Sequence, residues 1–247
     1  MYLENLIPSF FAAIVAPVSL LRRIFNPRLV SFGMLANLSK LHRLGVFKGV
    51  NLVIDIGANN GQYAYMASRV FGQIPIWSYE PDPACFTKLK QTHEKFGISG
   101  ACYQFAVADI TGQKMLQLYD NSANNSFLLR EDYENTAISS TTVDCITLDS
   151  IGKKIPLKAI IFLKMDVQGF ELAVLKGGIE LLKRCKFVQI EASLRHAYRG
   201  NTNISDIFEV LSKNNFRCLD IIDTLRDKNS PYSCLAELDL LFINESL

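Results

Sequence analysis

Short apolar runs alternate with helical patterns along most of the chain. Residues 51–56 are nearly all apolar, without regular polar positions, so they predict a parallel strand buried on both faces of a sheet. After a glycine turn, residues 62–68 follow a helical pattern. Later apolar runs predict further strands at residues 74–79, 103–107, 159–165, 187–190, 216–222 and 237–243. This order predicts an α/β fold in which a mostly parallel seven-stranded sheet ends in an antiparallel pair.

Other patterns place helices and loops between these strands. Asp82 and Pro83 mark a helix start, with Asp82 as the cap and Pro83 at the first helical position. Glu171 opens a helix predicted over residues 172–182, and no helix is predicted after Glu191. A hairpin arm is expected at residues 112–119, followed by a polar loop over residues 121–126 that could cover a site.

The first 48 residues have a different pattern, and we treat them as a helical extension of a single domain that spans residues 49–247. Leu6–Leu21 are almost wholly apolar, but this run is shorter than the ~20 residues that cross a bilayer, and two prolines interrupt it. We expect a helix there, followed by a second helix over Val30–Leu44 that ends at Gly45.

Two roles are open for the first of these helices. It could pack on the core, or it could pack on a partner subunit. The second arrangement would make the protein a homo-oligomer. Because Arg22 and Arg23 follow its apolar run, it could instead lie on an anionic membrane surface as a peripheral contact.

Composition narrows the range of functions. The chain has 247 residues, of which 49% are hydrophobic and 20% charged, as in ordinary globular proteins. Its net charge is only +2 and it has no long basic run, so no nucleic-acid partner is expected. The six cysteines are scattered without metal-ligand spacing, which indicates reduced thiols and a cytoplasmic protein.

The turn after the first predicted strand indicates a cofactor site. A dinucleotide fingerprint needs glycine at the third position of the loop, but Asn59 stands there between Gly57 and Gly61. Asp55, at the end of the strand, would repel a phosphate and attract a cationic sulfonium. These features favour S-adenosylmethionine. The residues expected to bind it are Asp55, Gly57, Ala58, Asn59, Gly61, Tyr63, Glu80, Pro81, Asp109 and Asp166.

Two acidic residues extend this site along the sheet edge. Glu80 ends the second strand about 20 residues beyond the glycines, the usual place of an acid that binds ribose hydroxyls. Asp109 follows the third strand, and we expect it at the same edge as Asp55 and Glu80, where it either contacts the adenine amine or is a simple turn residue.

Several motifs together resemble the FkbM family of S-adenosylmethionine-dependent methyltransferases. The most distinctive is the Lys-x-Asp-x-x-Gly-x-Glu run at residues 164–171, in which Gln168 replaces a glutamate frequent in the family. The resemblance covers about residues 49–193, and its motifs are Asp55–Gly61, Tyr79–Pro83, Ala106–Gly112, Thr147–Asp149, Leu163–Glu171 and Val174–Gly178. It implies a Rossmann-like class I methyltransferase fold with helices on both faces of the sheet, and methylation of a hydroxyl on a sugar, glycolipid or secondary metabolite.

Methyl transfer to a hydroxyl needs a group that takes its proton, and five residues near the strand ends are candidates: Lys164, Asp166, Glu171, Glu191 and His196. Asp166 is our first choice. His196 has a suitable pKa for a general base, but a solvated loop residue is an equal alternative. Asp166 and Glu191 could instead hold Mg²⁺ and acidify the hydroxyl. Lys164 and Glu171 could simply form an ion pair that braces the turn.

Two other functions remain open at this point. A nucleotide-dependent oxidoreductase would share the sheet, although Asn59 in the glycine loop counts against it. A non-catalytic, membrane-associated protein could also keep the fold, because fold does not imply function. The intact acids Asp55, Glu80, Asp166 and Glu171 argue against such a loss of activity.

Overall fold

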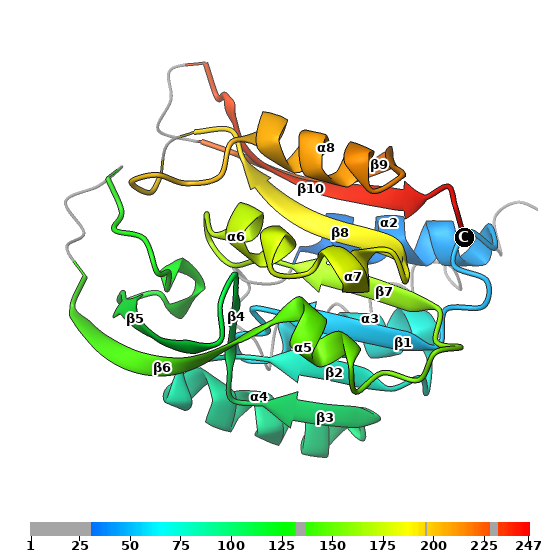
Figure 1. Cartoon of the computed structure of the whole chain (residues 1–247), viewed down its shortest axis with the longest axis horizontal. Helices are drawn as coiled ribbons and strands as arrows, with labels where there is room; N and C mark the ends of the chain where they lie inside the picture. Colours follow the sequence, from blue (N-terminus) through cyan, green and yellow to red (C-terminus); the bar gives the residue numbers. More distant parts are fainter. Residues whose placement is uncertain (1–30, 132–136, 196, 228–231) are drawn as a thin grey trace, which may run out of the picture.

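The computed structural model describes residues 31–131, 137–195, 197–227 and 232–247 (Figure 1). Its helices are α2 (Phe32–Arg43), α3 (Gln62–Phe71), α4 (Pro83–Phe96), the 3₁₀ turn η1 (Ser122–Asn124), α5 (Leu148–Gly152), α6 (Glu171–Lys176), α7 (Ile179–Leu182) and α8 (Ile204–Lys213). Its strands are β1 (Leu52–Ile56), β2 (Ile76–Tyr79), β3 (Gly100–Tyr103), β4 (Ala106–Ala108), β5 (Gly112–Leu118), β6 (Ser139–Thr147), β7 (Ile161–Met165), β8 (Cys185–Ser193), β9 (Phe216–Arg226) and β10 (Leu235–Asn244).

The strands of the described residues form two sheets. The larger has seven strands in the order β3-β2-β1-β7-β8-β10-β9, and the smaller has three in the order β4-β6-β5. In the larger sheet β1 is parallel to β2 and β7, whereas β10 is antiparallel to both β8 and β9. The predicted mostly parallel sheet with an antiparallel final pair is therefore confirmed.

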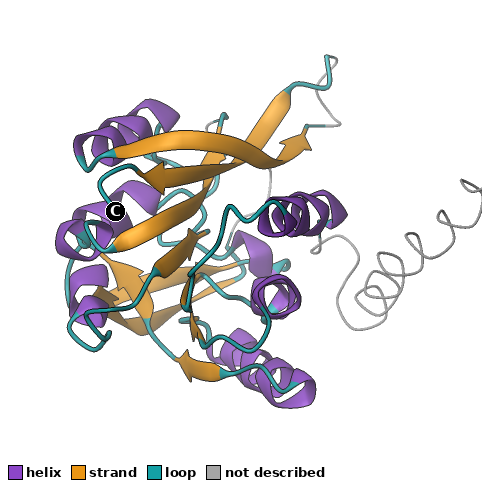
Figure 2. Cartoon of the chain, turned by 90° about the vertical axis from the view of Figure 1, so that its right-hand side faces the viewer, coloured by secondary structure: helices purple, strands orange, loops and turns teal. Residues whose placement is uncertain are grey.

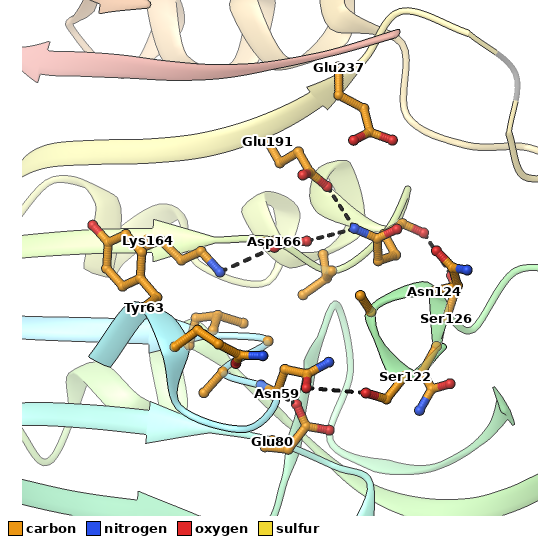
Figure 3. A pocket seen from close by; sticks show the side chains of 18 of the residues that line it. Asn59, Tyr63, Glu80, Ser122, Asn124, Ser126, Lys164, Asp166, Glu191 and Glu237 are labelled. Carbon is orange, nitrogen blue, oxygen red and sulfur yellow. Dashed lines mark hydrogen bonds and ion pairs between the residues drawn. The ribbon is translucent and has the colours of Figure 1, made fainter. Parts of the chain in front are cut away.

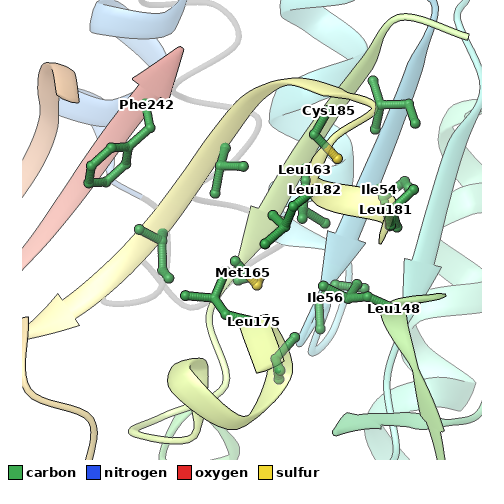
Figure 4. Close-up of a cluster of buried hydrophobic side chains, with 14 of the residues drawn as sticks. Ile54, Ile56, Leu148, Leu163, Met165, Leu175, Leu181, Leu182, Cys185 and Phe242 are labelled. Carbon is green, nitrogen blue, oxygen red and sulfur yellow. The ribbon is translucent and has the colours of Figure 1, made fainter. Parts of the chain in front are cut away.

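Helices cover both faces of the larger sheet (Figure 2). On β1, Ile54 and Ile56 face a core shared with α5, α6, α7 and α8, while Val53 faces the core formed with α2 and α3 (Figure 4). All five residues of β1 and all five of β7 are buried. A strand covered on both faces needs apolar residues throughout, which explains why residues 51–56 show no alternation.

The second predicted helix is present as α2. Ser31 caps it by accepting a hydrogen bond from the Met34 N–H at 3.2 Å, and the Asn37 side chain donates to the Ile222 carbonyl of β9 at 2.8 Å. The first predicted helix, over residues 6–21, lies outside the described residues. The boundary between residues 48 and 49 stays a prediction, although α2 packs directly on the sheet. No helix in the described ranges is long and apolar enough to cross a membrane.

The predicted strand over residues 103–107 is wrong. Tyr103 ends β3 beside Tyr79 in the larger sheet, and Ala106 begins β4, which pairs with Cys145 of β6 in the smaller sheet. One apolar run therefore serves two sheets. β6, the strand that pairs with β4, was not predicted from the sequence, because a local pattern does not reveal which segments pair.

Two further differences concern helices. The helix predicted over residues 172–182 is divided into α6 and α7 at Gly177 and Gly178. A Cβ on Gly177 would lie 2.3 Å from the Ala108 carbonyl oxygen. A Cβ on Gly178 would lie 2.5 Å from Leu148. These glycines thus let β4 and α5 pack closely against the turn between α6 and α7. The structure also contains α8 between β8 and β9, where no helix was predicted.

Gly57→Ala tests how tightly the end of β1 contacts the end of β7. Gly57 has φ +74°, and a Cβ there would lie 1.9 Å from the Asp166 carbonyl oxygen. Gly97→Ala is a matched control, since Gly97 has φ +58° with nothing within 4 Å. The control should lose about 1–2 kcal/mol from the left-handed backbone alone. Gly57→Ala should lose clearly more in urea unfolding, and equal losses would contradict this close contact.

Candidate active site

A cavity of about 530 Å³ opens where β1, β7 and β8 end (Figure 3). One side is formed by the glycine loop after β1 and by Glu80, which follows β2. The loop over residues 121–126 lines it as expected, and the end of β9 and the start of β10 form the opposite side. The cavity therefore lies at the edge where open α/β sheets bind ligands.

The glycine loop has the left-handed backbone that glycine and asparagine adopt more readily than other residues. Gly57, Asn59 and Gly61 all have positive φ angles, of 74°, 47° and 87°. The N–H groups of Gly57 and Ala58 both donate to the Tyr79 carbonyl, at 3.1 and 3.0 Å. The side chain of Asn59, at the third loop position, joins the glycine loop to the loop over residues 121–126, because its Oδ1 accepts a hydrogen bond from Ser122 Oγ at 3.3 Å.

Glu80 is buried beside this loop and lines the cavity. Its Oε2 accepts from the Asn59 N–H at 2.7 Å and its Oε1 from the Asp82 N–H at 2.9 Å. Burial raises the pKa of Glu80 to about 7 although both N–H donors lower it. Glu80 thus holds the glycine loop in place, and its contact with ribose stays a prediction.

Asp55 and Lys164 form a buried ion pair on neighbouring strands. They are register partners, and the Lys164 Nζ lies 3.6 Å from Asp55 Oδ1. Burial raises the pKa of Asp55 to about 6, while the Lys164 charge lowers it. Neither Asp55 oxygen has a hydrogen-bond partner. Lys164 lines the cavity but Asp55 does not, so Asp55 acts on the site through Lys164 rather than from the cavity wall.

Lys164 connects this pair to Asp166, whose Oδ2 lies 3.4 Å from Nζ. Burial lowers the pKa of Lys164, but the charges of Asp166 and Asp55 more than reverse this effect. Burial likewise raises the pKa of Asp166, but Lys164 and a hydrogen bond from Gln168 bring it below its usual value. Asp166 is therefore an ionised carboxylate with 33% of its side chain exposed, and it lines the cavity.

Glu191 lies next to Asp166, but its pKa is shifted in the opposite direction. Gln168 Nε2 donates to Asp166 Oδ1 at 2.9 Å and to Glu191 Oε2 at 2.7 Å, so the two acids share one amide (Figure 3). Burial, followed by the Asp166 charge, raises the pKa of Glu191 well above its usual value. Two neighbouring carboxyl groups with diverging pKa values are typical of acid–base sites.

Glu171 does not pair with Lys164, so the alternative in which these two residues form an ion pair that braces the turn is wrong. Its Oε1 accepts from the N–H groups of Val167 at 3.2 Å and Gly169 at 3.1 Å. Burial raises the pKa of Glu171 to about 7. Glu171 thus braces the turn before α6 through the backbone, and it does not line the cavity.

Three other expected site residues lie elsewhere. Asp109 does not share the sheet edge with Asp55 and Glu80, because it follows β4 of the smaller sheet; its side chain is 42% exposed and pairs with Lys114 at 3.5 Å. Gly61 precedes α3 and does not line the cavity. His196 lies outside the described residues. The expected site residues that do line the cavity are Gly57, Ala58, Asn59, Tyr63, Glu80, Pro81, Lys164, Asp166 and Glu191.

Sequence reasoning missed the contribution of β10. Asp239 is the register partner of Glu191, and both Asp239 and Glu237 line the cavity. Gln189 links this strand to α3, since it accepts from Tyr63 Oη at 2.8 Å and donates to Asp239 at 3.1 Å. The predicted antiparallel direction was the available signal, because it brings the start of β10 to the edge where the parallel strands end.

The donor set suits S-adenosylmethionine better than a phosphate-bearing cofactor. Glu80 and Asp166 place carboxylates on the cavity wall, which would repel a pyrophosphate and attract a sulfonium or an ammonium group. Mg²⁺ has less support: within the part of the chain that the structure describes, no group of three or more His, Cys, Asp or Glu side chains could hold a metal ion.

Comparisons with known proteins agree with this chemistry. The sequence matches the Methyltransferase FkbM domain over residues 55–218, about two thirds of the chain. It is 27% identical to Methyltransferase 1 of Beauveria bassiana over 157 residues, 57% of this chain and 63% of that protein. It is 22% identical to 2-O-methyltransferase NoeI of Sinorhizobium fredii over 174 residues, 65% of this chain and 70% of NoeI.

A third relative is the hexuronic acid methyltransferase AglP of Haloferax volcanii, 23% identical over 137 residues, 56% of this chain and 54% of AglP. The chain thus spans less than two thirds of Methyltransferase 1 and of AglP. Among solved structures, magnesium protoporphyrin IX methyltransferase from Synechocystis PCC 6803 superposes with a TM-score of 0.47 and 12% identity, over 86% of this chain and 80% of that one.

The family match decides between the enzyme classes that the glycine loop left open. It begins at Asp55, covers the glycine loop and the Asp166 motif, and extends into β9. The chain therefore belongs to the FkbM family of S-adenosylmethionine-dependent methyltransferases.

Proposed function

We propose that the protein transfers a methyl group from S-adenosylmethionine to a hydroxyl of a sugar, either free or part of a larger small-molecule or glycan acceptor. The observation that carries this proposal is the pair of Asp166 and Glu191, which line the same cavity as the glycine loop. A hydroxyl is a weak nucleophile until its proton is taken, so an ionised carboxylate at this place is the group that the reaction needs.

The cofactor would be held on the side of the cavity formed by the glycine loop and Glu80. Gly57, Ala58 and Asn59 line this side, and Glu80 adds a carboxylate with lone pairs for hydroxyl donors. When bound, S-adenosylmethionine would supply a methyl group on a positively charged sulfur. A hydroxyl oxygen would bond to the methyl carbon, and the sulfur would leave as a neutral thioether. Asp166 lies between Glu80 and Glu191 in Figure 3, and thus between this side and the proposed acceptor side.

Asp166 is the proposed base. It is ionised because Lys164 and Gln168 favour its charged form, and it accepts the hydroxyl proton as the new bond to the methyl group forms. On the acceptor side, Glu191, Glu237 and Asp239 offer carboxyl groups that could hydrogen-bond the remaining hydroxyls of a sugar. The names of NoeI, a 2-O-methyltransferase, and AglP, which acts on a hexuronic acid, support this substrate class.

Glu80→Ala tests the cofactor side. Loss of a buried acceptor for ribose hydroxyls should weaken binding of S-adenosylhomocysteine by ~1–3 kcal/mol, roughly five- to a hundredfold, measured by calorimetry. Glu94→Ala, on the exposed side of α4, is the matched control and should bind like the wild type. Since Glu80 also braces the glycine loop, melting temperatures should accompany the titrations. Unchanged affinity in Glu80→Ala would refute the ribose assignment.

Asp166→Asn tests the base. Labelled S-adenosylmethionine is incubated with a panel of neutral sugars and uronic acids, and methylated products are identified by mass spectrometry. The variant should lose turnover by ~10²-fold or more while it still binds S-adenosylhomocysteine. Asp144→Asn, an exposed aspartate on β6, should keep full activity. Wild-type turnover in Asp166→Asn would exclude Asp166 as the base.

The same assay examines the Mg²⁺ alternative. If Asp166 acts as a base without a metal, a chelator should leave the rate of the wild type unchanged. Loss of activity with chelator and recovery with Mg²⁺ would instead favour a metal held by the carboxylates.

A further inference from the structure

Gln168 departs from the family pattern and occupies the centre of the acidic site. Its backbone is in the left-handed region, with φ +54°, and its carbonyl accepts from Ser126 Oγ at 2.8 Å. A left-handed conformation is costly for a residue with a side chain, so it persists only where surrounding contacts hold it. Here it directs the Gln168 side chain into the space between Asp166 and Glu191.

The Gln168 amide satisfies three partners at once. Its two Nε2 hydrogens reach Asp166 and Glu191, and its Oε1 accepts from Tyr198 Oη at 2.9 Å. The opposite amide orientation would place Oε1 against two carboxyl groups and Nε2 against a hydroxyl. A glutamate here would likewise add a third acidic group, where glutamine donates two hydrogen bonds without adding charge.

Tyr198 determines the orientation of this amide. It is buried, and the Arg130 guanidinium lies 5.3 Å from the centre of its ring. Burial raises the pKa of Tyr198 well above its usual value, so its hydroxyl keeps its hydrogen. The Asn124 carbonyl oxygen, in the loop that covers the cavity, lies 3.0 Å from the same hydroxyl, so the single hydrogen of Tyr198 is shared between two acceptors, Gln168 Oε1 and Asn124 O.

We propose that Gln168, oriented by Tyr198, is a positioning residue that holds the Asp166 and Glu191 carboxyl groups for proton transfer from the acceptor hydroxyl. The role of these acids in proton transfer rests on the proposed function. The arrangement of the amide does not, because it follows from hydrogen bonds among three different segments: the β7–α6 turn, β8 and the loop that carries Tyr198.

Gln168 also limits how many charges meet at this point. Among the described residues, the charged and titratable groups around Asp166 and Glu191 include Lys164 on β7, Asp55 on β1, Glu171 on α6, Glu237 and Asp239 on β10, and Tyr198. The cationic residues Arg130 and Arg195 line the same cavity. Lys164 is the cation in contact with Asp166, and acids predominate around it. A glutamate at residue 168 would add a negative charge that favours the protonated forms of Asp166 and Glu191.

Gln168→Glu is therefore the central experiment. A carboxylate base works above its pKa and loses activity as the pH falls through it, so a raised pKa moves the acid limb of the rate profile to higher pH. We expect a shift of about one pH unit or more in the carboxyl titrations of residues 166 and 191, followed by ¹³C NMR without any acceptor. The acid limb of kcat should shift by a similar amount.

Gln113→Glu is the matched control, because Gln113 also donates its amide to an aspartate, Asp144, at 2.9 Å, but on the exposed face of the smaller sheet. Gln113→Glu should leave unchanged both the carboxyl titrations of residues 166 and 191 and the acid limb of kcat. Tyr198→Phe keeps the ring and removes the hydroxyl, so kcat should fall about tenfold while binding of S-adenosylhomocysteine and KM for S-adenosylmethionine stay as in the wild type.

The outcomes separate the two proposals. A shifted carboxyl titration in Gln168→Glu, in an enzyme that methylates none of the sugars tested, would support the positioning role of Gln168 and refute the proposed substrate. Unshifted titrations of both acids in a folded Gln168→Glu variant would overturn the positioning role, whatever the activity. So would a Tyr198→Phe variant with unchanged kcat, or one whose rate loss is fully explained by lower thermal stability.

Discussion

The site depends on one buried cation, Lys164, at the centre of the larger sheet. Its ammonium group lies within 3.6 Å of Asp55 and 3.4 Å of Asp166, and its side chain is only 5% exposed. Buried charges are tolerated when they are paired, and removal of one partner typically costs about 3–5 kcal/mol. The register of β1 against β7 must therefore be kept, because a shift of one residue would move Asp55 and Lys164 to opposite faces.

This ion pair also shapes the chemistry of the cavity. Lys164 keeps Asp166 ionised, and the charge on Asp166 in turn contributes to the raised pKa of Glu191. The two acids thus differ because of their surroundings rather than their side-chain type. Gln168 bridges them with a neutral amide, so the site contains hydrogen bonds to both acids without a further charge.

The smaller sheet adds the cover of the cavity. Leu116 of β5 lines the cavity, and the loop after β5 contacts the glycine loop through Ser122 and the β7–α6 turn through Ser126. The loop therefore joins the cofactor side to the acidic side. Close approach of β4 to the turn between α6 and α7 needs Gly177, which leaves room for the Ala108 carbonyl.

The sequence by itself determined the elements whose signals are local. A mostly apolar run predicted β1, because a strand buried on both faces is apolar except where a buried charge such as Asp55 is paired. Asp82 and Pro83 predicted the start of α4, since capping depends on adjacent residues. The glycine loop, Glu80 and Asp166 were expected at one edge, because parallel strands end on the same side of a sheet, and they line one cavity.

Only the tertiary structure decided which segments meet. Pairing of β4 with β6 removed Asp109 from the site, and the antiparallel β10 brought Asp239 to it. The raised pKa of Glu191 arises from burial and from the charges of Asp166, Glu237 and Asp239, which lie on other segments. Gln168 likewise meets Glu191 and Tyr198, which are remote from it in sequence. Such contacts depend on packing between segments, which no local pattern of hydrophobic and polar residues encodes.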